Sequence, residues 1–157
     1  MNKYKIKYKK ITGKLVRRSF PSLVGKKIFF IERDLGQFSA MVLWLFPFLR
    51  VMLINPTVRG RTNKQTIGLF AHELCHFELF LADSWFKTMI GTFWYALSEK
   101  RKIEDERETD MLTIRKGYAR ELYESVVEGS KNKSEKVLNR YFSPAEIKGY
   151  ANRIGKW

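Results

Sequence analysis

Cysteine is almost absent from this chain of 157 residues, since Cys75 is the only one. A single cysteine cannot form an intramolecular disulfide, so the fold must rest on its core alone. The N-terminus is rich in lysine and lacks the apolar segment and small-residue cleavage site of a secretory signal. We therefore expect a protein of a reducing compartment, the cytoplasm.

Acidic residues are scarce relative to basic ones. The chain has 16 Asp and Glu against 30 Lys and Arg, which gives a formal charge of +14. This excess favours anionic partners such as nucleic acid, anionic lipid or acidic proteins. The basic residues are dense from Lys3 to Arg18, so we expect contact with an anionic surface, membrane or nucleic acid, through this N-terminal segment.

Long uninterrupted hydrophobic runs are also missing. The run at 38–54 contains Pro47 and Arg50, and the run at 77–97 contains three charged residues. Each charge at the centre of a bilayer costs about 2 to 3 kcal/mol. These segments favour peripheral contact with a membrane over a transmembrane helix.

The length and the 45% share of apolar residues predict one α+β domain with its own core. Residues 1–61 carry the strand signals. Alternation of lysine with apolar residues predicts a strand over 3–9, and β-rich apolar runs predict strands over 27–32 and 51–55. The segment 37–49 is expected to be helical.

Residues 62–129 carry helix signals. Thr62 and Gln65 match the T-x-x-Q pattern of a capping box and precede the apolar run 67–81, which predicts a helix starting there. Apolar residues at helical spacing predict a second long helix over about 98–128.

The C-terminal part, residues 130–157, begins with a polar linker at 130–134. Ser143 and Glu146 have the spacing of a second capping box, with a proline at the first helical position. They predict a short final helix over 144–153.

The sequence A-H-E-L-C-H-F at 71–77 contains the pattern H-E-x-x-H. Residues four apart on a helix point in directions about 40° apart, so His72 and His76 can bind one metal ion. Glu73 points about 100° away from His72, where it can reach a metal-bound water rather than the metal. The pattern predicts a zinc site in which Glu73 is the catalytic base.

A hydrolytic zinc site usually has three protein ligands, and no third histidine exists in this chain. The third ligand must be a carboxylate or Cys75, and Cys75 projects from another side of the helix than His76. On the helix predicted from about 98, Glu106 and Asp110 fall on the apolar face.

A buried carboxylate requires a compensating cation. We therefore assign Glu106 as the third ligand and Asp110 as the acceptor of a ligand histidine's second ring N–H. The alternative is a solvated acidic patch paired with Arg101, Arg107 and Arg115.

These residues resemble the gluzincin metallopeptidases, in which H-E-x-x-H on one helix is completed by a glutamate in E-x-x-x-D on a later helix. The resemblance covers residues 51–110, with E-x-x-x-D at 106–110. The chain is closest in size to the minigluzincins. The resemblance implies a zincin-like single domain, in which a small mixed sheet packs on the H-E-x-x-H helix and the glutamate-bearing helix follows.

The resemblance also implies further roles. A strand before the metal helix would pair with an extended peptide substrate, and here its residues are Met52, Leu53, Ile54 and Asn55. Tyr118 is the candidate that would stabilise the oxyanion. In some minigluzincins a C-terminal segment is inhibitory, which implies the same role for residues 141–157.

Two functions fit these observations. The first is a zinc endopeptidase that acts on proteins or peptides. The second is a basic module that binds nucleic acid or a membrane surface and keeps a structural or vestigial zinc site. The oligomeric state and the natural substrate do not follow from the sequence.

Overall fold

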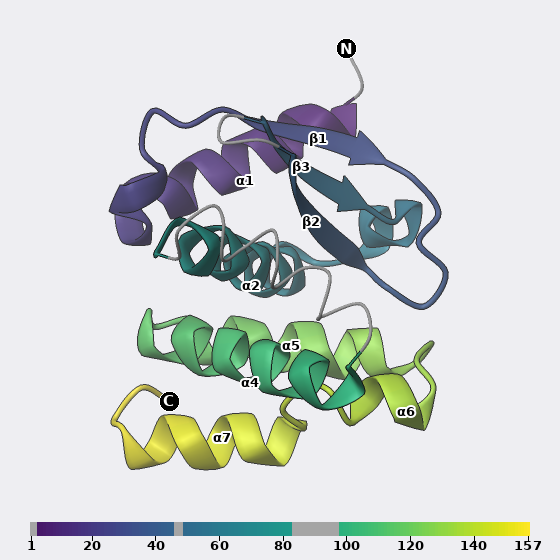
Figure 1. Cartoon of the computed structure of the whole chain (residues 1–157), viewed down its shortest axis with the longest axis vertical. Helices are drawn as coiled ribbons and strands as arrows, with labels where there is room; N and C mark the ends of the chain where they lie inside the picture. Colours follow the sequence, from purple (N-terminus) through teal and green to yellow (C-terminus); the bar gives the residue numbers. More distant parts are fainter. Residues whose placement is uncertain (1–2, 46–48, 83–97) are drawn as a thin grey trace.

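The computed structural model describes residues 3–45, 49–82 and 98–157. Within these ranges, helices stack in layers below a small sheet (Figure 1). The predicted α+β class is therefore confirmed.

The basic N-terminal segment forms a helix, α1 (Lys3–Ser19), so the strand predicted over 3–9 is wrong. Tyr8 and Leu15 are seven residues apart, which is two helical turns, and both are buried. Ile6 would share a strand face with Tyr8, yet it is 47% exposed. The alternation of lysine with apolar residues is a coincidence within a longer helical pattern.

Three strands form a mixed sheet of order β1-β3-β2: β1 (Ile28–Glu32), β2 (Ala40–Leu45) and β3 (Leu49–Ile54). The strands predicted over 27–32 and 51–55 are confirmed. The helix predicted over 37–49 is wrong, because β2 pairs antiparallel with β3 along its whole length. A short apolar run suits a helix or a strand equally well, and the neighbouring strand decides between them.

The central position of β3 contradicts its predicted role as the substrate-binding edge. Met52, Leu53 and Ile54 face partners on both sides, in β1 and in β2. Asn55 follows the strand, and its side-chain oxygen accepts a hydrogen bond from Thr57 N at 3.1 Å. This hydrogen bond caps the 3-10 helix η2 (Pro56–Gly60).

The helix α2 (Asn63–Ala82) carries the H-E-x-x-H pattern through the middle of the molecule. The predicted capping box is confirmed, since Gln65 N donates to Thr62 Oγ1 at 3.2 Å and Thr62 N donates to Gln65 Oε1 at 2.9 Å. Figure 1 shows α1 and the sheet on one side of α2, and α4 (Glu99–Arg115) and α5 (Ala119–Ser130) on the other. Both helix histidines therefore lie between two packed layers.

The single helix predicted over 98–128 is wrong, since the chain turns between α4 and α5. Gly117 has a φ of 88°, a left-handed conformation that ends α4. The apolar spacing continues across the turn because both helices contribute to one core. Gly68 permits the close approach of α2 and α5, because a Cβ at this position would lie 2.0 Å from the carbonyl oxygen of Glu121 in α5.

The C-terminal part contains α6 (Glu135–Leu138) and α7 (Pro144–Arg153), so the predicted final helix is confirmed. Its capping box is present, with Ser143 N donating to Glu146 Oε2 at 2.8 Å. Ile147 is fully buried against α4 and α5. The helix α7 thus completes a second small core.

The predictions about membranes concern two apolar segments. Residues 38–54 contribute to β2 and β3, and the larger part of 77–97 lies outside the described residues. None of the helices in the described ranges combines the length and the apolar character that a bilayer crossing requires.

Candidate metal centre

Two packed helices bring the three predicted ligands together. His72 and His76 project from α2, and Glu106 projects from α4. Glu106 Oε2 lies 3.1 Å from His72 Nε2 and 3.4 Å from His76 Nε2, and the two Nε2 atoms are 3.2 Å apart. Glu106 is only 8% exposed, so a solvated acidic patch is the wrong description of this residue.

These separations match a metal-binding geometry. Zinc binds nitrogen and oxygen ligands at about 2.0 to 2.1 Å, so two ligands of a tetrahedral ion are about 3.3 Å apart. The distances of 3.1, 3.2 and 3.4 Å in this triangle lie around that value. His72, His76 and Glu106 can therefore hold a metal ion, with a fourth position left for water or substrate.

Asp110 orients His72. Its Oδ1 lies 2.9 Å from His72 Nδ1, and its Oδ2 accepts a hydrogen bond from Phe142 N at 2.8 Å. A carboxylate acceptor places the proton on Nδ1 and leaves the Nε2 lone pair directed at the centre. Phe142 belongs to the segment 141–157, so this segment contributes to the site whether or not it is inhibitory.

Thr109 does the same for His76, a role that the sequence analysis missed. The Thr109 hydroxyl donates to Asp105 O at 2.8 Å, and its oxygen lies 3.2 Å from His76 Nδ1. Because the hydroxyl proton is already used, Thr109 Oγ1 accepts the Nδ1 proton of His76. The available signal was position: Thr109 is three residues after Glu106, the next turn of the same helix.

The Nε2 lone pairs of His72 and His76 and the Glu106 carboxylate face one another. Because all three are electron-rich, a positive charge between them is needed to prevent repulsion. Burial lowers the pKa of His72, but the hydrogen bonds to Asp110 and Glu106 outweigh it and raise that pKa to about 10. Burial raises the pKa of Glu106, and the nearby His76 and His72 more than reverse this effect and lower it below its usual range. A proton can bridge two of the three atoms, whereas a metal ion binds all three.

Glu73 lies beside the triangle and not within it. It is buried on α2, and its burial raises its pKa above the usual range of a glutamate. Glu73 and His72 line the same small cavity of about 40 Å³, which is enough space for a few water molecules. A base that acts on a water molecule needs space of this kind beside its carboxylate.

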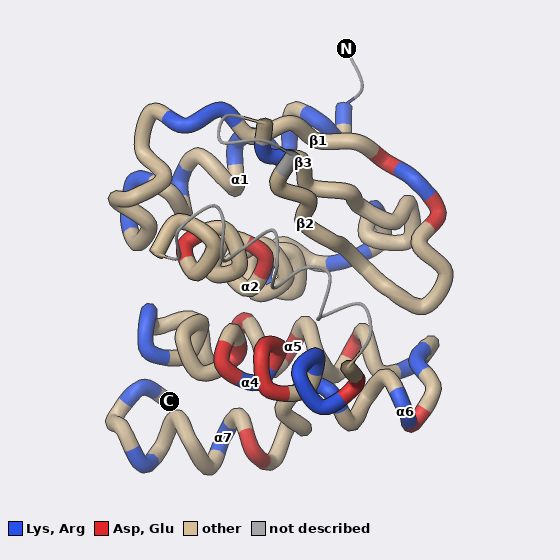
Figure 2. The backbone as a smooth tube through the Cα atoms, in the orientation of Figure 1, with Lys and Arg blue, Asp and Glu red and all other residues tan. Residues whose placement is uncertain are grey.

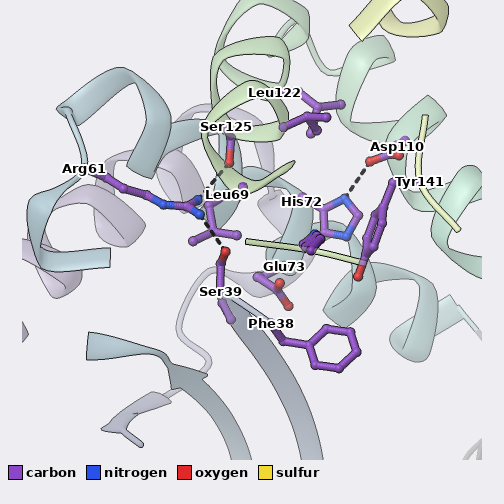
Figure 3. Close-up of a pocket in the computed structure, with 14 residues that line it drawn as sticks. Phe38, Ser39, Arg61, Leu69, His72, Glu73, Asp110, Leu122, Ser125 and Tyr141 are labelled. Atoms are coloured by element: carbon purple, nitrogen blue, oxygen red, sulfur yellow. Dashed lines mark hydrogen bonds and ion pairs between the residues drawn. The ribbon is translucent and has the colours of Figure 1, made fainter. Parts of the chain in front are cut away.

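The cavity also holds residues that the sequence analysis did not select (Figure 3). The Tyr141 ring lies 5.9 Å from the His72 ring, between centroids. Tyr118, the predicted oxyanion-stabilising residue, is instead in the core below α1, where its hydroxyl is 2.7 Å from Ser19 Oγ. Among the described residues that line this cavity, Tyr141 supplies the phenol.

Replacing Thr109 with valine should weaken metal binding about 10- to 100-fold, because His76 Nδ1 loses its acceptor. Titration of zinc against a competing chelator measures the change. Thr113→Val is the matched control, since Thr113 is a buried threonine one turn later whose hydroxyl donates to Thr109 O. Equal zinc affinities in the two variants would refute the orienting role.

Comparisons with known proteins add no family to this description. The chain matches no protein-family model, no curated protein and no solved structure. The resemblance to gluzincins therefore stays a prediction, and the chemistry of the site has to be argued from its geometry.

Proposed function

We propose that this protein is a zinc-dependent endopeptidase with a zincin-like fold. The observation that carries the proposal is the triangle of His72 Nε2, His76 Nε2 and Glu106 Oε2, with Glu73 in the adjoining cavity. Two imidazoles and one carboxylate are a known ligand set of hydrolytic zinc sites. The order of a small sheet, α2 and then the glutamate-bearing α4 also agrees with the fold expected from the gluzincin resemblance.

When bound, zinc would polarise the scissile carbonyl and lower the pKa of a water molecule. Glu73 accepts a proton from the attacking water and delivers it to the departing amine. Asp110 and Thr109 hold the two imidazoles in the orientation that the site needs. Tyr141 replaces Tyr118 as the candidate donor to the developing oxyanion.

The edge strand β2 (Ala40–Leu45) is the candidate for substrate pairing in place of β3. Within the described ranges, β2 pairs with β3 on one side and with no strand on the other. It also packs on α2, and Ala40 lines the cavity that holds Glu73. An extended peptide could add to this edge through backbone hydrogen bonds, which tolerate many sequences.

The test of the proposal is metal-dependent proteolysis. Purified protein should contain about one zinc ion per chain, cleave casein, lose this activity on chelation and regain it when zinc is returned. Metal analysis and gel electrophoresis of the casein measure the two properties. Stoichiometric zinc without cleavage would contradict the proposal and favour a binding module.

The binding module has its own support in α1. Five basic side chains in the middle and the last turns of this helix are exposed, and none of them forms an ion pair in the part of the chain that the structure describes: Lys9, Lys10, Lys14, Arg17 and Arg18. Figure 2 shows basic residues along α1, whereas α4 carries both acidic and basic residues. Such a helix suits an anionic surface, and this role is compatible with peptidase activity.

A further inference from the structure

Two cationic side chains, Arg61 and Lys133, line the cavity beside the metal centre. Arg61 comes from the junction between η2 and α2, and Lys133 comes from the turn between α5 and α6. Figure 3 shows Arg61 pointing toward the cavity that His72 and Glu73 line. Neither cation belongs to the catalytic group described above.

In the part of the chain that the structure describes, the short contacts of both cations are with neutral groups. Arg61 donates from Nη2 to Ser39 Oγ at 2.6 Å and from Nη1 to Ser125 Oγ at 3.3 Å. Lys133 Nζ lies 4.0 Å from the centre of the Tyr141 ring. Within the described ranges, neither makes an ion pair with a carboxylate. Burial lowers the pKa of each of these two residues, which reflects the loss of water around its charge.

The two side chains converge beside a glycine of α5. A Cβ at Gly129 would lie 3.5 Å from Arg61 Nη2, 3.9 Å from Ser39 Oγ and 4.0 Å from Lys133 Cε. Because Gly129 has no side chain, a small space remains there, and the side chains of Arg61, Ser39 and Lys133 border it. The cavity of about 40 Å³ accepts a small polar group and excludes a bulky side chain.

Counted over the described residues alone, the charges of the metal centre and the adjoining cavity do not balance once a divalent metal is bound. Glu73, Glu106 and Asp110 contribute three buried carboxylates. One dication together with Arg61 and Lys133 exceeds these by one positive charge. Glu128 is near Arg61, but it is already paired with Lys131 at 2.7 Å. One more carboxylate in the cavity would restore neutrality in a place where unbalanced charge is costly.

We propose that Arg61 and Lys133 form a recognition pocket for a carboxylate of the substrate, next to the scissile bond. This inference rests on the proposed peptidase function and adds a substrate class, acidic peptides. The carboxylate is either an aspartate or glutamate side chain or the C-terminus of the peptide. Arg61 supplies directed N–H donors, and Lys133 supplies a point charge.

Binding can be tested without catalysis. The zinc-loaded protein should bind N-acetylglycine more tightly than N-acetylglycinamide, which has the same shape without the charge, and the amide signal of Gly129 should shift in NMR spectra. Lys133→Met should reduce the affinity for the acid about tenfold, whereas Lys133→Arg should keep most of it. If the carboxylate binds only to zinc, the wild type, Lys133→Met and Lys133→Arg should bind N-acetylglycine with equal affinity. This result would refute the proposed pocket.

Gly129→Ala supplies a second variant that keeps both charges. Its methyl group would meet Arg61 Nη2 at 3.5 Å, which is ordinary contact, so the protein should fold and the pocket should shrink. We expect weaker binding of N-acetylglycine and an unchanged zinc content. Thermal unfolding checks the fold of each variant. Undiminished binding in Gly129→Ala would also contradict the proposal.

Cleavage assays then identify the source of the carboxylate. The first pair of peptides has both ends blocked and differs only in one residue, Glu or Gln, so it tests whether the pocket binds an acidic side chain. The second pair has no acidic side chain and ends in either a free carboxylate or an amide, so it tests whether the pocket binds the C-terminus. A preference of about tenfold for either acid, lost in Lys133→Met, supports the pocket. Equal rates in both pairs refute it, whereas a failure to cleave any peptide refutes the peptidase function and leaves the binding result valid.

Discussion

Replacing Glu73 with glutamine should reduce casein cleavage by about 10²- to 10⁴-fold, the range that one general base contributes. Glutamine has nearly the same shape but cannot accept a proton at neutral pH. Glu73 does not belong to the ligand triangle, so the variant should keep zinc at the wild-type stoichiometry. Proteolysis and metal content, measured on the same preparation, test both parts of this prediction.

The combination of results identifies the role of Glu73. Loss of cleavage together with loss of zinc would mean that the substitution disturbs the site as a whole. Glu124→Gln is the control, because Glu124 is a partly exposed residue of α5 that pairs with Lys64 at 3.1 Å. Retained cleavage in Glu73→Gln would eliminate the proposed mechanism, whatever the metal content.

The grouping of the candidate metal ligands could be predicted because it depends on local geometry. Positions 72 and 76 share a face of any regular helix, and Glu106 and Asp110 share a face of the next one. A carboxylate on an apolar face is informative, since its burial requires a compensating charge. The structure places all four side chains in one cluster.

The errors concern features that depend on distant parts of the chain. The lysine alternation in α1 looked like a strand over seven residues, whereas the burial of Tyr8, Thr12 and Leu15 at helical spacing marks the helix. The position of β3 at the centre of the sheet depends on β2, whose apolar sequence also suits a helix. Sequence periodicity describes one element at a time and does not specify which strand is at an edge.

The residues around the cavity were missed for a similar reason. Arg61, Lys133 and Tyr141 come from loops at separate points in the chain, and no spacing connects them. Tyr118 was selected as the tyrosine nearest the metal-binding face of one long predicted helix, but in the structure α4 ends at Arg115, before this residue. Loop residues acquire a shared role only through tertiary structure.

Replacing Glu106 with glutamine should lower the affinity for zinc by more than about 100-fold, a larger loss than removal of an orienting residue. A neutral amide oxygen is a weaker ligand, and the two imidazoles alone do not complete the site. Glu104→Gln is the matched control on the same helix, since the Glu104 side chain is 62% exposed and pairs with Lys100 at 3.9 Å. Metal analysis after dialysis against a weak chelator distinguishes the two variants.

Thermal unfolding provides an independent measure of the same event. An ion that binds only the folded chain stabilises it by about 2.7 kcal/mol at a free concentration of 100 times Kd. For a chain of 157 residues this is a rise in Tm of roughly 5 to 10 °C. The wild type and Glu104→Gln should show this rise when zinc is added, and Glu106→Gln should show almost none. A full rise in Glu106→Gln would mean that zinc is held by other residues, and the link between α2 and α4 through one ion would have to be abandoned.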